Sequence, residues 1–383
     1  MNYTGRGNGS DGVLTVSGDT TDSLSASSIS IAAGVDNATI DAGLSWAAGD
    51  LIYLHQSQGS GKNKKETLQV LTYDNGTGDI TFTTPADNTY STSGANRAQA
   101  IRRKQYSAIV FSSNANLFIQ AWNTSTGIGG LFPHLVLGKI TGAGTINGKG
   151  RGFIGGYGGT HYGNNQTGQQ GESSTGVGGQ TTSRNGSGGG GGGIRQTGEQ
   201  GHGGGGGAGD DNGSNGALNV SGPNSGSAGE GGTQEGDDDL LELPIGAAGG
   251  GGGHGDTAGS DGHGNGGDGG ASFDINAEDV DDTVLADLRG DDGAGTSAGN
   301  ADQAGGGGGA SGNGLLNGKT VEVGSWQSQA TAGGTANVSA NGGAGSKGRF
   351  VINACEISFN GSNPTAFENE GGHEWCTFGG SIY

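Results

Sequence analysis

The sequence predicts a mainly β protein: an N-terminal β-sandwich or β-roll, then a polyglycine II helix bundle with loop inserts, then a short β-like C-terminal segment. Two observations predict this class. The chain has 383 residues, of which 93 are glycine and only 29% are hydrophobic, so one large apolar core cannot account for it. Short apolar or alternating runs between turn formers occur near both ends and predict strands there. From these composition shifts we expect three domains, at 1–150, 151–318 and 319–383.

The N-terminal domain is predicted from a series of short strand-like runs. The runs lie at 13–16, 28–31, 50–55, 66–73, 79–83, 106–111, 117–121 and 135–140. Those at 66–73 and 79–83 flank Asp74–Gly78, which has the composition of a hairpin turn. Strands of this length and spacing are typical of a sandwich or a small roll.

Four uninterrupted glycine runs define the middle domain. They are Gly188–Gly193, Gly203–Gly207, Gly249–Gly253 and Gly305–Gly309. Glycine buries no side chain and loses much backbone entropy on folding, so such runs are either flexible linkers or segments held by dense backbone hydrogen bonding. Runs of five or six glycines are too regular for chance and favour the ordered alternative. Collagen needs a strict Gly-X-Y period and abundant proline, and this chain has 5 prolines. We therefore expect polyglycine II helices lying side by side and bonded through their backbones.

Short and long connections alternate between the glycine runs when 262–270 is counted as an interrupted run. The short connections are 194–202 and 254–261, and the long ones are 208–248 and 271–304. If successive helices are antiparallel, both long inserts emerge at the same end of the bundle.

Apolar side chains in the two long inserts are the candidate receptor-binding residues. They are Leu240, Leu241, Leu243, Phe273, Val284, Leu285 and Leu288. The apolar spacing in the second insert predicts a helix with Asn276 as its N-cap and Gly290 at its end. These side chains either cover the bundle end or form a receptor-facing surface, because loops on a rigid scaffold often carry recognition. If they are covers, the receptor site is to be sought around Tyr157, His161 and Tyr162 or Trp326 and Trp375.

The C-terminal domain returns to strand-like sequence at 320–323 and 349–359. It is too short to hold a large core alone, so we expect it to pack on another domain. Cys355 and Cys376 are compatible either with a disulfide or with free thiols, depending on the redox compartment.

The net charge of −20 excludes some partners. Nucleic acid and anionic membranes would both be repelled. No segment approaches the roughly 18 apolar residues of a membrane span, so we expect no membrane insertion. The first residues also lack the apolar core of a signal peptide. A virion component that is released by cell lysis would act outside the cell and yet lack a signal peptide. The alternative is a chain that begins after a signal peptide has been removed.

Glycine runs interleaved with polar loops after a β domain, such as Ser187–Ile194 and Ala248–His254, resemble the distal long-tail-fibre tip adhesins of T-even-type bacteriophages. The resemblance covers roughly residues 150–318 and is one of organisation. It implies a receptor-binding protein of the virion tail fibre, extracellular in action, with a host cell-surface receptor (protein or polysaccharide) and other tail-fibre subunits as partners. A cellular extracellular adhesin or filament subunit is the alternative, with other filament subunits as partners.

A second resemblance concerns Ile140–Gly148, which is similar to a turn of the β-helix in polygalacturonase-like polysaccharide enzymes. Glycoside hydrolysis needs two carboxylates at a defined separation, and Asp237 or Asp238 is a candidate for one. Because the regular rungs that would position it are not evident, we predict no enzyme and no catalytic residues, and keep a polysaccharide-degrading β-helix as the second alternative.

Metal-binding signals are weak. Gly252–Asp256 only approaches the calcium-binding nonapeptide pattern. The acidic clusters Asp279–Asp282 and Asp291–Asp292 are more typical of a solvated face, although their oxygens suit calcium. We predict no cofactor and no metal site, with calcium left open.

Overall fold

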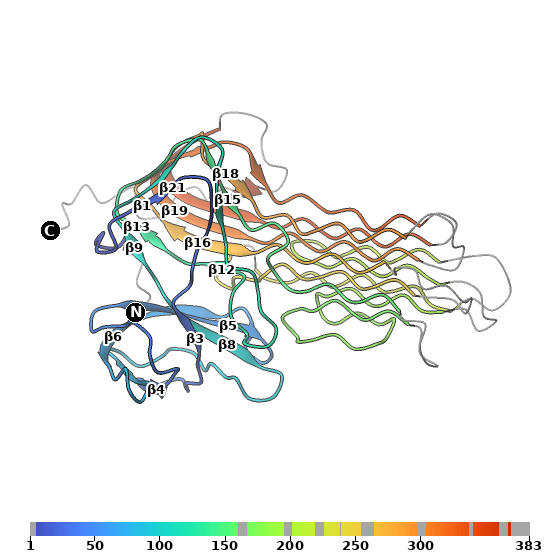
Figure 1. The fold of residues 1–383 in the computed structure, drawn as a ribbon, viewed down its shortest axis with the longest axis horizontal. Helices are drawn as coiled ribbons and strands as arrows, with labels where there is room; N and C mark the ends of the chain where they lie inside the picture. Colours follow the sequence, from blue (N-terminus) through green and yellow to red (C-terminus); the bar gives the residue numbers. More distant parts are fainter. Residues whose placement is uncertain are drawn as a thin grey trace.

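The computed structural model describes residues 5–159, 167–194, 201–218, 226–237, 239–253, 264–296, 304–336, 340–359 and 367–368. All elements assigned within these ranges are β-strands, which confirms the prediction of a mainly β protein. A stack of parallel strands and a separate antiparallel sheet occupy one end of the molecule, and long glycine-rich segments extend away from them side by side (Figure 1).

The strands are short and spread over the whole chain. In order they are β1 (Val13–Val16), β2 (Asp19–Thr21), β3 (Ala26–Ser28), β4 (Asn37–Thr39), β5 (Leu51–Gln58), β6 (Lys65–Tyr73), β7 (Asp79–Phe82), β8 (Arg97–Arg102), β9 (Gln105–Tyr106), β10 (Ala108–Phe111), β11 (Ala115–Phe118), β12 (Leu131–Phe132), β13 (Leu135–Val136), β14 (Lys139–Thr141), β15 (Gly144–Asn147), β16 (Ser272–Asn276), β17 (Asp279–Val280), β18 (Leu285–Asp287), β19 (Gly314–Val323), β20 (Trp326–Gln327), β21 (Phe350–Phe359) and β22 (Phe367–Glu368).

The parallel strands form a β-helix and not the predicted sandwich or roll. One face stacks β1, β10, β14, β17, β19 and β21 in parallel, and a second face stacks β2, β11, β15, β18 and β20. Each coil passes from one face to the next through a tight turn. At Gly142, φ is +94° and a Cβ would lie 2.1 Å from the carbonyl oxygen of Phe111, so glycine is required there.

The core of the β-helix is built from side chains stacked in register between coils. Ile109 pairs with Ile140, which pairs with Val280, which in turn pairs with Val321. All four are at most 3% exposed. Strands from all three composition zones contribute to this core, because long stretches of chain are inserted between successive coils.

The first insertion, between β2 and β9, is a six-stranded antiparallel sheet in the order β3-β8-β5-β6-β7-β4. Its predicted hairpin is confirmed, since β6 and β7 pair antiparallel across the turn at 74–78. Ile52, Leu54 and Phe82 lie in its own apolar core, whereas Tyr53 and Ile101 face a second cluster shared with the β-helix.

The later insertions build what we call the glycine array. Its segments are 152–159, 167–172, 177–183, 188–194, 201–208, 211–218, 226–235, 246–253, 264–271, 288–296, 304–313, 328–336 and 340–349. They lie side by side without forming assigned strands, and they extend away from the β-helix (Figure 1). The Ala271 N–H, for example, donates to the Gly148 carbonyl at 2.8 Å, next to β15.

Hydrogen bonds in the array follow a period of three residues. Along segment 304–313, the N–H groups of residues 304, 307 and 310 donate to segment 246–253. Those of residues 305, 308 and 311 donate to segment 340–349, and those of residues 306, 309 and 312 to segment 288–296. Successive residues therefore point in three directions in turn, unlike a β-strand, where they alternate between two.

Inner segments of the array are surrounded on all sides. Segment 304–313 also accepts hydrogen bonds from segments 201–208, 264–271 and 328–336. At Gly307 a Cβ would lie 1.9 Å from the Gly205 carbonyl oxygen, and at Gly250 it would lie 2.1 Å from that of Gly190. Real Cβ atoms do not approach backbone so closely, so only glycine fits in these inner runs.

In outer segments, side chains that are three residues apart, such as Asn265 and Asp268, cap backbone groups at the array edge. Asn265 and Asp268 accept from the N–H groups of Gly158 (2.9 Å) and Gly155 (2.7 Å). The same hydrogen bond, from a backbone N–H to a side-chain oxygen, recurs elsewhere on the perimeter. The accepting side chains and their donors are Asn212 with Gln234, Asn215 with Gly231, Asp292 with Ala332 and Asn341 with Ala336. These short side chains satisfy edge donors that have no neighbouring segment.

The helix predicted between Asn276 and Gly290 is wrong. This stretch forms β17 and β18, because Val280, Val284 and Leu288 complete a coil of the β-helix core. The apolar spacing that suggested one helical face reflects the inward positions of two short strands and their turn.

Candidate functional site

The structure buries most of the predicted receptor-binding residues. Leu240 and Leu243 lie in the cluster that joins the antiparallel sheet, the β-helix and the foot of the array, and Phe273, Val284 and Leu288 lie in the β-helix core. Each of these five side chains is at most 1% exposed, so none is accessible to a receptor. Only Leu241 (70% exposed) and Leu285 (36%) reach the surface.

Both long inserts contribute to the β-helix end of the array, and both also supply array segments that extend from it. Insert 271–304 supplies β16, β17 and β18. Insert 208–248 supplies two outer array segments and then packs on the antiparallel sheet, where the Leu243 N–H donates to the Asn63 carbonyl at 3.1 Å. Of the two interpretations, burial favours the one in which these inserts are structural covers.

Of the other predicted receptor positions, Tyr157 is accessible. Trp326 is buried at 7% exposure, and His161, Tyr162 and Trp375 lie outside the described residues. Tyr157 is 61% exposed and belongs to the outer segment 152–159. Its backbone is fixed, since its carbonyl accepts from the Gln169 N–H at 2.8 Å and the neighbouring Gly156 N–H donates to Gly249 at 2.9 Å.

Side chains around Tyr157 form what we call the edge surface: Ile154, Tyr157, Gln169, Asn265 and Asp268. Ile154 is 37% exposed and lies one array period before Tyr157. On one side are Asn265 and Asp268, each with one oxygen bound to a backbone N–H of segment 152–159. On the other side is Gln169, opposite Tyr157 in the neighbouring segment. An exposed ring thus stands on a fixed backbone, and the neighbouring segments carry amide and carboxylate side chains.

Two carboxyl groups at this edge have raised pKa values. Burial, reinforced by the nearby charges of Asp291 and Glu172, raises the pKa of Asp268. Burial also raises the pKa of Asp291, with Asp292 and Asp287 adding to the effect. The two residues are on adjacent segments, since the Asp291 N–H donates to the Asp268 carbonyl at 2.8 Å. A carboxyl group with a raised pKa stays protonated to a higher pH than a fully solvated one.

The buried polar side chains elsewhere hold parts of the fold together. Asp274 of β16 bonds Lys65 at 2.8 Å and Arg103 at 3.0 Å, which ties the antiparallel sheet to the β-helix. Glu172, at the foot of the array, accepts from Gln58 (2.9 Å) and Trp122 (3.0 Å). These groups are enclosed and have no open face toward solvent, so we assign them structural roles.

His55 is a fully buried part of this junction. Its Nε2 donates to the Leu243 carbonyl at 2.8 Å, and its Nδ1 lies 2.9 Å from the Ser57 hydroxyl. Burial lowers the pKa of His55 to about 4. Because the unfolded chain would take up this proton near pH 6.5, the folded state loses stability as the pH falls from 6.5 toward 4.

We expect unfolding free energy to drop by up to about 3 kcal/mol across this pH range, as a pKa shift of this size implies. Urea titrations at pH 7, 6, 5 and 4 measure it. In His55→Gln the loss between pH 6.5 and 4 should be smaller than in the wild type. Equal slopes in both proteins would mean that His55 does not stay neutral in the fold.

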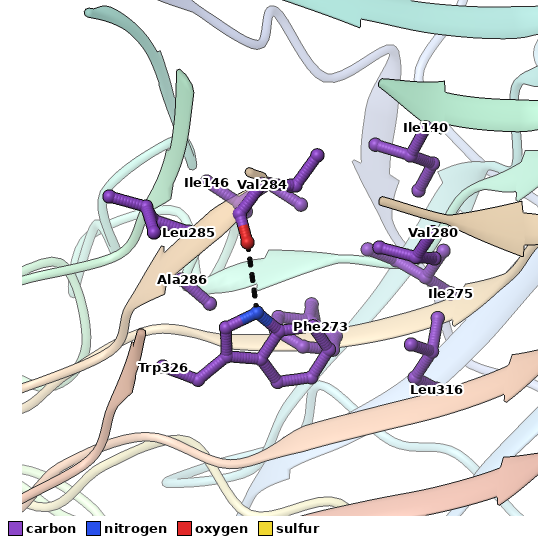
Figure 2. A pocket seen from close by; sticks show the side chains of 10 residues that line it. All are labelled: Ile140, Ile146, Phe273, Ile275, Val280, Val284, Leu285, Ala286, Leu316 and Trp326. Carbon is purple, nitrogen blue, oxygen red and sulfur yellow. Dashed lines mark hydrogen bonds between the residues drawn. The ribbon is translucent and has the colours of Figure 1, made fainter. Parts of the chain in front are cut away.

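The cavity in Figure 2 is not a ligand site. It has a volume of about 10 Å³ and lies inside the β-helix, among the apolar side chains of Ile140, Phe273, Val280 and their neighbours. The indole N–H of Trp326 donates to the Val284 carbonyl at 3.1 Å, so that group is already satisfied. A space of this size holds at most about one water molecule.

Other predicted site positions are placed as follows. The Asp237 carboxylate accepts the Glu242 N–H at 3.1 and 3.2 Å and closes a turn, and Asp238 lies outside the described residues. Cys355 is exposed, and Cys376 also lies outside the described residues. Asp279 pairs with Lys139 at 2.9 Å. Within the described ranges, no group of three or more His, Cys, Asp or Glu side chains is arranged to hold a metal ion.

The described part of the chain contains no helix long and apolar enough to cross a membrane.

Comparisons with known proteins find little similarity. No protein-family model and no curated protein matches the chain. Two solved structures are similar at 10% sequence identity, each over 92% of this chain. One is the Gp54 tailspike of Acinetobacter baumannii bacteriophage AP22 in complex with A. baumannii capsular saccharide, with a TM-score of 0.19. The other is the tailspike protein gp49 from Pseudomonas phage LKA1, with a TM-score of 0.20. This chain spans 62% and 68% of their lengths, and TM-scores of this size do not establish a shared fold.

The prediction that the chain is not an enzyme is contradicted. It relied on the absence of regular rungs, and the structure contains a stack of parallel coils that includes the predicted turn at Ile140–Gly148 as β14 and β15.

Proposed function

We propose that this chain is a virion tail attachment protein that binds a bacterial surface polysaccharide through side chains displayed on a polyglycine II scaffold. The observation that carries the proposal is the three-residue hydrogen-bond period of the glycine array. That period and the glycine-only interior are what polyglycine II helices would produce, since such helices have three residues per turn. Side chains then emerge only on the perimeter, in fixed rows.

The edge surface supports polysaccharide as the ligand. Tyr157 supplies an exposed ring, and Gln169, Asn265 and Asp268 supply hydrogen-bonding groups beside it. Rigid aromatic anchors on a preorganised backbone bind with little entropy loss.

The scaffold itself is tested by hydrogen exchange. Amides in Gly188–Gly193 and Gly249–Gly253 should be protected, because each donates to a neighbouring backbone carbonyl. Mass spectrometry of peptides from these runs gives the measurement. Complete exchange within seconds at neutral pH would eliminate the polyglycine II scaffold.

Attachment is tested with purified protein on a panel of bacterial cells and their isolated capsular and lipopolysaccharide glycans. We expect retention on at least one polysaccharide at micromolar concentration. Gly307→Ala, which disrupts the array, should lose this retention, whereas Gly179→Ala, where a Cβ has its nearest neighbour 3.7 Å away, should keep it. No retention on any cell or glycan would refute the proposal.

A cellular extracellular adhesin or filament subunit would share the scaffold. Immunogold labelling separates the two: label on tails of phage particles supports the proposal, and label on the producing cell supports the alternative.

Cleavage of the bound polysaccharide is a second candidate function, favoured by the raised pKa values of Asp268 and Asp291 on adjacent segments. Glycoside hydrolysis uses one protonated and one ionised carboxyl group. Size-exclusion chromatography of the polysaccharide after incubation measures it. Asp268→Asn and Asp291→Asn should each stop cleavage and leave retention measurable; cleavage that persists in both variants excludes this pair.

A further inference from the structure

We infer that Tyr157 is a stacking platform for an uncharged or amino-substituted pyranose ring and that the edge surface discriminates against acidic sugars. This inference rests on the proposed function and names the ligand class of the same site. It follows from the exposure of the ring, the rigidity beneath it, the polar groups beside it and the charge of the chain.

The exposure of Tyr157 is not explained by packing. Large aromatic side chains elsewhere in the described chain are often fully enclosed, as with Tyr53 and Tyr90, and so is Phe153 of the same segment; each is at most 1% exposed. Tyr157 is 61% exposed, and Ile154, three residues before it on the same segment, is also exposed. An exposed aromatic ring loses the benefit of burial, about 25 cal/mol per Å² of apolar area, so a ligand that covers it gains that benefit.

The backbone beneath the ring is fixed at four consecutive residues. Gly156 and Gly159 donate to Gly249 and Gly252, each at 2.9 Å. Tyr157 accepts from Gln169, and Gly158 donates to the Asn265 side chain at 2.9 Å. Little backbone freedom is therefore left to lose when a ligand binds.

The neighbouring side chains suit hydroxyl groups. Asn265 uses its Oδ1 on Gly158, which directs its amide NH₂ away from that bond as a donor. Asp268 uses Oδ1 on Gly155, and its second oxygen remains an acceptor. A pyranose presents an apolar face to a ring and hydroxyl groups at its rim, which matches an exposed ring with donors and acceptors beside it.

Charge selects among pyranoses. The chain carries −20 overall. Asp268 belongs to the edge surface, and the charges of Asp291, on the adjacent segment, and Glu172 act on it; Lys149 lies near Asp291 and offsets part of its charge. A uronate or other acidic sugar would bring a further negative charge to this edge, whereas an amino sugar would bring a positive one. A flat apolar peptide partner is less suitable, because Ile154 is the one other exposed large apolar side chain in the described segment 152–159.

The test compares three hexasaccharide probes on the full-length protein: N-acetylated chitin oligomer, chitosan oligomer and oligogalacturonate. Saturation-transfer NMR and isothermal titration calorimetry give binding. We expect the first two to bind and oligogalacturonate to bind at least about tenfold more weakly. Tyr157→Ser should lose about tenfold or more in affinity and Tyr157→Phe should retain it, because the aromatic face is the binding group.

Val177→Ser is the matched control, since Val177 is also exposed, at 64%, on another outer segment and should not affect binding. Two results overturn the inference and leave the proposed function in place. One is an affinity that is the same in Tyr157→Ser as in the wild type. The other is a wild-type affinity that is highest for oligogalacturonate. Wild-type protein that binds bacterial cells but none of the three probes overturns it as well. If neither cells nor probes are bound, the proposed function fails and the inference fails with it.

Discussion

Replacing Gly307 by alanine is expected to destabilise the glycine array by about 3 kcal/mol, at the upper end of the usual cost of overpacking. A Cβ at this position would lie 1.9 Å from the carbonyl oxygen and 2.4 Å from the carbonyl carbon of Gly205. Both atoms belong to a backbone that is itself bonded to its own neighbours, so no side chain can rotate away to make room. The array must move apart or lose hydrogen bonds around segment 304–313.

Differential scanning calorimetry and hydrogen exchange of the inner runs measure this effect. Gly179→Ala is the matched control, because the same methyl group there has Gln170 Oε1 as its nearest neighbour, at 3.7 Å. We expect Gly179→Ala to melt with the wild type and Gly307→Ala to melt several degrees lower, as about 3 kcal/mol implies for a chain of this size. If both variants melt together, the inner runs are not close-packed.

Of the features of the sequence, the glycine runs were the best predictor of the array. Backbones that pack this closely leave no room for a Cβ, so no residue other than glycine fits. The inner runs at 203–207, 249–253 and 305–309 are glycine throughout, as full enclosure requires. The outer segments show a weaker sequence pattern, in which some side chains are spaced three residues apart. In Gly264–Gly270, Asn265 and Asp268 are three residues apart among glycines, a spacing that matches the three-residue hydrogen-bond period of the array.

The β-helix could not be predicted from local sequence, because its coils are separated by insertions of unequal length. Leu135 pairs with Asn276, and Asn317 pairs with Asn353, so no fixed repeat spacing exists. The strands themselves are as short as two residues, which gives little periodicity to detect. Only Ile140–Gly148 suggested the fold from sequence. This stretch contains two strands of one coil and the tight glycine turn between them.

Candidate site residues were misplaced for a related reason. Leu240, Leu243 and Phe273 are sparse apolar residues within polar sequence. This pattern is compatible either with exposed side chains that bind a receptor or with side chains buried in a core. Burial of a large apolar side chain is the commoner outcome, since it stabilises by about 1.5–3 kcal/mol. The exposed position, Tyr157, lies in a glycine-rich stretch that also contains Phe153, and its exposure depends on array packing that the sequence does not display.

Removing the Asp274 carboxylate is the second change expected to have a large effect. Asp274 is bonded by Lys65 at 2.8 Å, by Arg103 at 3.0 Å and by the Tyr53 hydroxyl at 3.3 Å, all at the junction of the antiparallel sheet with β16. In Asp274→Ala two cations stay buried without their partner, and breaking a buried pair in this way costs about 3–5 kcal/mol. Urea unfolding at pH 7 measures the loss.

Two further variants identify its cause. Glu278→Ala removes an exposed pair with Arg6, whose side chains are 38% and 44% exposed, and should cost at most about 1 kcal/mol. Lys65→Met combined with Asp274→Ala should recover part of the loss, because it removes one of the stranded charges. A loss for Asp274→Ala no larger than that for Glu278→Ala would show that the junction is hydrated.

The pH profile of the same junction gives an independent check. Burial alone would raise the pKa of Asp274, but the charges of Lys65 and Arg103 outweigh it and hold the pKa at about 2. An unfolded aspartate has a pKa near 3.9, so the unfolded chain takes up this proton first and stability falls as the pH drops from about 4 to 2. Asp22, held at about 2 by His134 and Lys104 against its own burial, adds to the same fall. Asp274→Asn should therefore flatten the stability curve below pH 4 in part. It should not abolish the His55-dependent change between pH 6.5 and 4, because burial is the main cause of that pKa shift and the Asp274 charge opposes it. If Asp274→Asn and the wild type lose stability equally between pH 4 and 2, the carboxylate is not held ionised by Lys65 and Arg103.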